Sequence, residues 1–133
     1  NIEQIREQQQ SLIINKKQTK IDIAIHYTQK EFALYTTDED LKLLCDYVMM
    51  YAEKLNFENI KPIIVKDLSN LDLYHFGWNL WNHFKPIKQE DISKLLKMAF
   101  LALKDIEVDS IKSHLKDDPK KGIIKIIDNL SGH

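Results

Sequence analysis

Apolar residues recur at helical spacing through most of the chain, and this pattern predicts a protein built from helices. The clearest amphipathic segments are residues 38–56, 71–85, 89–105 and 108–115. Residues 38–56 carry two apolar stripes beside a narrow polar face, which is typical of a helix sandwiched in a bundle or lying in a subunit interface. We therefore expect an all-α single domain over residues 1–133, with five or six helices.

Two patterns compete over residues 20–35. Alternation from Ile21 to Tyr27 is typical of a strand, but a helical wheel gathers most apolar residues of the whole segment in one arc, which favours a helix. Residues 1–18 are more polar and predict an N-terminal arm or helix, packed on a partner chain. The helically spaced apolar residues of this arm are Ile2, Ile5, Leu12 and Ile13.

The C-terminal segment also supports two interpretations. Asp118 as a cap and Pro119 at the first helical position predict a last helix that reaches Leu130. The sequence GIIKII is rich in β-branched residues, however, and residues 122–127 could instead form a short strand after the Pro-Lys-Lys-Gly turn. We favour the helix by a small margin.

The segment 71–84 holds both tryptophans of the chain. Its apolar arc is wide enough for this helix to be central to the core, and Gly77 leaves room for a neighbouring helix. Proteins that stack bases on aromatic rings also need a basic groove, yet no basic residue lies between Lys66 and Lys85. We therefore expect the aromatic residues to be core residues: Tyr74, Phe76, Trp78, Trp81 and Phe84.

The same helix has a polar arc, formed by Asp72, His75, Asn79 and His83. Asp72, His75 and His83 are candidate metal ligands, which would make the protein a metal-dependent enzyme. His75 and His83 are separated by about 12 Å of helical rise, too far to share one ion. A solvated or hydrogen-bonded polar face is therefore favoured, and the metal enzyme is our third hypothesis.

Amino-acid composition limits the fold class, the cellular compartment and the source of the protein. Three glycines and three prolines are too few for a β-sandwich or barrel. A single cysteine, Cys45, the lack of a signal-like start and the absence of an apolar run near 20 residues favour a cytoplasmic protein without a membrane span. The excess of Lys, Ile and Asn is typical of an AT-rich genome, and we expect a bacterial source.

Nucleic acid is the alternative partner. The net charge is −1 and Arg6 is the only arginine, which disfavours base-specific recognition. Residues 90–125 could nevertheless form two helices joined by a bend, which with a strand at 122–127 would resemble a winged helix-turn-helix. The DNA-binding residues of that unit would be Lys94, Lys97, Lys112, Lys116, Lys120 and Lys121.

Motifs for catalysis are missing from the sequence. It has no glycine-rich phosphate or dinucleotide loop and no G-x-S-x-G elbow around its serines. We therefore expect no enzymatic activity, no cofactor and no small-molecule substrate. The leading hypothesis is a small helical regulatory or protein-interaction module that binds a protein partner or associates with itself, ahead of the DNA-binding regulator.

Overall fold

The structure is a computed structural model that describes residues 1–85 and 87–132, and it confirms an all-α fold. The described residues form five α-helices: α1 (Ile2–Phe32), α2 (Asp38–Ala52), α3 (Asn70–His83), α4 (Gln89–Ala99) and α5 (Val108–His114). One 3-10 turn, η1 (Leu101–Leu103), follows α4, and a second, η2 (Leu130–Gly132), ends the described chain. Among these helices, none has the length and apolar character needed to cross a bilayer.

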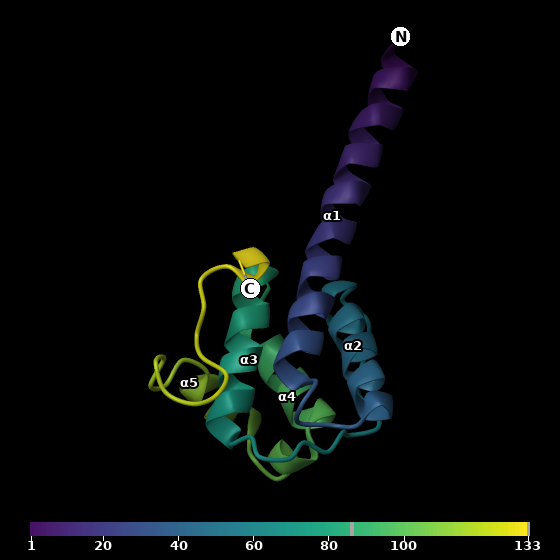
Figure 1. Cartoon of the computed structure of the whole chain (residues 1–133). Coiled ribbons are helices and arrows are strands. Elements are labelled where there is room, and N and C mark those ends of the chain that lie inside the picture. Colours follow the sequence, from purple (N-terminus) through teal and green to yellow (C-terminus); the bar gives the residue numbers. More distant parts are fainter. Residues whose placement is uncertain (86, 133) are drawn as a thin grey trace.

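Helix α1 settles the competition between strand and helix over residues 20–35. The helical interpretation is confirmed, and the polar residues before it belong to the same helix rather than to a separate one. Residues 1–20 are all exposed, and burial begins at Ile21. Figure 1 shows that this first part of α1 projects well beyond the body of the molecule. We call residues 1–20 the arm.

Helix α2 begins where its capping signals indicate. The Thr37 side chain accepts a hydrogen bond from the Asp40 N–H (3.1 Å), and acidic residues fill the first turn, where the helix dipole favours them. The helix packs against both α1 and α4, so its two apolar stripes face elements of this chain. Leu44 and Val48, for example, are completely or almost completely buried.

Helix α3 lies at the centre of the fold and supplies more buried residues than any other helix described here. Ser69 and Asp72 form a capping box at its start. A proline follows this segment at position 86, where we expect the helix to end, but that residue lies outside the described residues. At Gly77 a Cβ would lie 2.4 Å from Leu96 Cδ1, so the glycine permits the close approach of α4.

The structure corrects two predicted boundaries. Helix α4 ends at Ala99 rather than near residue 105, because Phe100 turns to an extended conformation and pairs with Ile63. Residues 122–127 form neither the favoured helix nor the alternative strand. They run as an irregular segment beside α3, seen as the yellow loop in Figure 1. Without that strand, residues 90–125 lack the wing of a winged helix-turn-helix.

Candidate functional site

Most of the polar arc of α3 is buried against the C-terminal segment, which we define as residues 117–128. Asp72, His75 and Asn79 are each exposed by 2% or less, although all three are polar. Burial of polar groups is tolerated when hydrogen bonds replace water. Most of the replacements come from the backbone of the C-terminal segment, and the others come from Ser69 and the Tyr27 hydroxyl. The polar arc therefore fixes a stretch of chain that has no helix or sheet of its own.

Asp72 uses both carboxylate oxygens. Oδ1 accepts hydrogen bonds from the backbone N–H groups of Ile123 (2.7 Å) and Ile124 (2.9 Å), while Oδ2 accepts from the backbone N–H (2.8 Å) and hydroxyl (3.0 Å) of Ser69. Burial alone would raise the pKa of this carboxyl. The four donated hydrogen bonds favour the charged form more strongly, so the pKa of Asp72 lies below its ordinary value.

His75 and Asn79 continue the same contact. The His75 ring places Nδ1 2.7 Å from the Ile124 carbonyl oxygen and Nε2 2.5 Å from the Asp117 carbonyl oxygen. Both ring nitrogens of His75 therefore face backbone carbonyl oxygens of the C-terminal segment. The Asn79 amide donates to the Lys125 carbonyl (2.9 Å) and accepts from the Ile127 N–H (3.0 Å).

His83 lies apart from this cluster, at the end of α3. Its Nε2 is 2.8 Å from the Lys20 carbonyl oxygen of α1. Partial burial lowers the pKa of His83, and the positive charge of Lys20 lowers it further, whereas the hydrogen bond to the Lys20 backbone raises it. The candidate metal ligands Asp72, His75 and His83 are thus each bound to different backbone groups. Among residues 1–85 and 87–132, no three His, Cys, Asp or Glu side chains converge as a metal site would require.

The lysines proposed for nucleic acid are partly engaged within the chain. Lys94 pairs with Glu90 (3.4 Å), and Lys97 donates to the carbonyl oxygens of residues 104 and 106. The ammonium of Lys116 lies 4.7 Å from the centre of the Trp78 ring. The other three are Lys112 on α5 and the exposed residues Lys120 and Lys121 in the following turn. The structure therefore divides these lysines among α4, α5 and a turn, and half of them already have partners.

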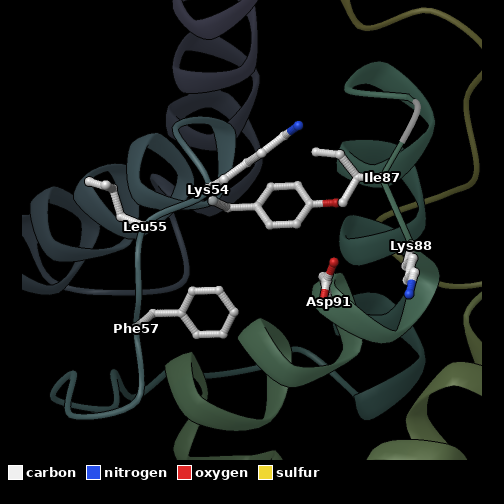
Figure 2. Close-up of a pocket in the computed structure, with 7 residues that line it drawn as sticks. Lys54, Leu55, Phe57, Ile87, Lys88 and Asp91 are labelled. Atoms are coloured by element: carbon white, nitrogen blue, oxygen red, sulfur yellow. The ribbon is translucent and has the colours of Figure 1, made fainter.

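A cavity of about 430 Å³ opens between the end of α2 and the start of α4. Figure 2 shows Lys54, Leu55 and Phe57 on the α2 side, and Lys88 and Asp91 on the α4 side. The lining mixes apolar walls with two cations and one carboxylate, and it includes no nucleophile with an adjacent base. Nothing in the sequence marked this cavity in advance, because its lining residues come from separate segments without a shared motif.

Tyr51, which also lines the cavity, has the one buried side-chain polar atom without a hydrogen-bond partner in the described part of the chain. Burial raises the pKa of its hydroxyl well above the ordinary value, and the negative charge of Asp91 adds to the rise. The hydroxyl therefore stays neutral across the physiological pH range.

Replacing Tyr51 with phenylalanine tests whether this hydroxyl is truly unpaired. Removal of an unsatisfied buried group is expected to raise the free energy of unfolding by about 1 kcal/mol, measured by urea denaturation. The matched control is Tyr47→Phe, one turn earlier on α2. The Tyr47 hydroxyl donates to the Lys61 carbonyl (2.5 Å), so this substitution should cost about 1 kcal/mol. Equal losses in both variants would show that Tyr51 has a partner.

Besides the cavity, the arm is an exposed feature that could bind a partner. Five large apolar side chains on it are more than half exposed: Ile2 (67%), Ile5 (56%), Leu12 (53%), Ile13 (67%) and Ile14 (66%). Two polar contacts join the C-terminal end of the arm to the body of the molecule. Lys17 pairs with Glu53 at 2.9 Å, and His83 contacts the Lys20 backbone. An exposed ion pair of this kind contributes less than about 1 kcal/mol.

The sequence showed the apolar residues of the arm as a diluted helical pattern, whereas only the structure shows that every residue of the arm is exposed.

Comparison with family models, curated proteins and solved structures returned no match to this chain.

Proposed function

We propose that this protein is a non-enzymatic interaction module that binds another protein chain through the arm. The observation that carries the proposal is the exposure of all residues from 1 to 20 in a helix that includes five large apolar side chains. Four of these five side chains, all but Ile14, lie on one side of the helix, and contiguous exposed apolar side chains commonly mark a binding surface.

The energetics of helix formation support the same function. A helical stretch of 12–15 residues or fewer is marginal in water, and even longer ones depend on packing of an apolar face. The β-branched isoleucines of the arm have a lower intrinsic helix propensity than alanine or leucine. A partner that covers Ile5 and Leu12 would supply the missing packing and hold the arm as a helix.

Other surfaces support an interaction less well. The apolar faces of α2, which suggested a docking surface in the sequence, pack on α1 and α4 of the same chain. DNA binding through residues 90–125 stays a prediction, with no feature of the structure favouring it over the arm. Lys97 donates hydrogen bonds to backbone carbonyl oxygens, and Lys116 lies over the Trp78 ring, so both already make contacts within the chain.

Site-specific photo-crosslinking in cells that make the protein tests the proposed function. A photoreactive residue at Gln9, in the middle of the arm, is expected to give a discrete crosslinked protein band. The same residue at the exposed Lys104 on the body is the matched control and should not give that band. Adding Ile5→Glu and Ile13→Glu should remove the Gln9 band, since the charges disrupt an apolar contact. Crosslinking no stronger at Gln9 than at Lys104 would contradict the proposal.

A further inference from the structure

The apolar residues of the arm form a stripe along one side of the helix, and lysines replace them toward its C-terminal end. The stripe begins with Ile2, Ile5 and Gln9, which are three and four residues apart, and continues with Leu12 and Ile13, three and four residues after Gln9. It continues into Lys16 and Lys20, where long aliphatic stems end in charges. Ile14 is separated from Ile13 by about 100° around the helix and faces away from the stripe.

We infer that the arm of a second copy of this chain covers the stripe, with the two arms antiparallel. This inference rests on the proposed function and adds to it the identity and orientation of the partner. Two helices that bury a shared apolar stripe form a coiled-coil-like pair, in which each apolar side chain fits among side chains of the facing helix.

Charge along the arm favours the antiparallel arrangement. Residues 1–10 carry Glu3, Glu7 and Arg6, a net charge of −1, whereas residues 11–20 carry only lysines and have a net charge of +3. An antiparallel pair sets each basic half against an acidic half. A parallel pair in register would set the two basic halves together, and Lys16 and Lys20 would meet their own copies at the seam.

Side-chain sizes fit the same arrangement when the two arms cross at Gln9. Ile5 then lies opposite Ile13 of the partner subunit, and Ile2 lies opposite the aliphatic stem of Lys16 of the partner subunit. The two Gln9 side chains meet at the centre, where an amide can both donate and accept a hydrogen bond. A polar residue at the seam costs stability but specifies register, so we expect a reversible dimer rather than a permanent one.

Sedimentation equilibrium of the full chain over a wide concentration range tests the second copy as partner. We expect a monomer–dimer equilibrium that Ile5→Glu with Leu12→Glu weakens at least tenfold. Ile14→Glu is the matched control, because Ile14 is as exposed as Ile13 (66% and 67%) but lies off the stripe, so this variant should dimerise like the unmodified chain. Unchanged tryptophan fluorescence would show that the body remains folded in each variant.

Disulfide trapping tests the orientation. In chains whose Cys45 is replaced by serine, Ile5→Cys and Ile13→Cys are made separately, mixed and oxidised under exchange. The antiparallel register predicts that the mixed 5–13 disulfide dominates. Dominance of the 5–5 and 13–13 disulfides would overturn the orientation and show a parallel pair.

The two sets of experiments separate failure of this inference from failure of the proposed function. A strict monomer at all concentrations overturns the second copy as partner. If the Gln9 crosslink in cells then still forms, to a protein of a different mass, the proposed function stands and only the partner is wrong. If the crosslink is also missing, both fail.

Discussion

Replacing Phe76 with alanine is expected to lower the free energy of unfolding by about 3–5 kcal/mol, a large fraction of the total for a domain of this size. Phe76 is 1% exposed and sits at the junction of three other rings. Its centroid lies 4.7 Å from that of Phe32, 5.9 Å from that of Tyr27 and 6.1 Å from that of Phe100. The truncation therefore opens a cavity where α1, α3 and the chain after α4 meet.

Urea denaturation monitored by circular dichroism measures this loss, and Phe76→Leu provides the control. Leucine retains most of the apolar volume but no ring, so we expect it to cost about 1–2 kcal/mol. A loss under about 1 kcal/mol for the alanine variant would mean that α3 is not at the centre of the core. A loss for leucine equal to that for alanine would mean that the ring contacts, rather than the filled volume, stabilise this junction.

The location of this core could be predicted from the sequence, because helical periodicity reports directly which face of a helix is buried. The wide apolar arc of residues 71–84 indicated a central helix, and Gly77 indicated a close approach, which the structure assigns to Leu96. The sequence also predicted an N-terminal arm or helix over residues 1–18. The sequence did not predict that the arm and residues 21–32 form one continuous helix, because polar residues such as Gln8 and Lys17 interrupt the apolar pattern without interrupting the helix.

The C-terminal segment could not be predicted, because its conformation depends on partners far away in the sequence. Asp118 and Pro119 are good helix-starting residues, and GIIKII is a good strand sequence, so both local patterns were misleading. The backbone is instead held by side chains of α3, about fifty residues earlier in the chain. Gly122 permits this contact: it has φ +88°, and a Cβ there would lie 2.6 Å from Asp72 Oδ1.

The polar arc shows why candidate sites chosen by residue type need a structure. Histidine and aspartate on one helical face are compatible with a metal, with a solvated surface and with structural hydrogen bonds, and spacing alone does not separate the three. The structure pairs His75 with two carbonyl oxygens and Asp72 with two N–H groups of the C-terminal segment. These residues therefore act as the attachment point of that segment.

Replacing Asp72 with alanine is accordingly expected to release the C-terminal segment and to lower the free energy of unfolding by about 2–4 kcal/mol. The substitution leaves the buried N–H groups of Ile123 and Ile124 without acceptors and removes the Asp72 half of the capping box of α3. Hydrogen exchange of these two amides should accelerate more than exchange in α2. Asp105→Ala, at an exposed position, is the control and should change stability by less than about 0.5 kcal/mol.

The same carboxylate should make attachment of the segment sensitive to acid. The pKa of Asp72 is lower in the folded protein than the ordinary value of 3.8, so the unfolded chain binds its proton first as pH falls. The stabilising contribution is therefore complete above about pH 5 and is lost as pH falls from about 4 through the folded-state pKa. Asp72→Asn keeps one acceptor oxygen and does not titrate, so its stability should depend less on pH in that range. An equal pH dependence in both proteins would show that Asp72 does not carry the effect.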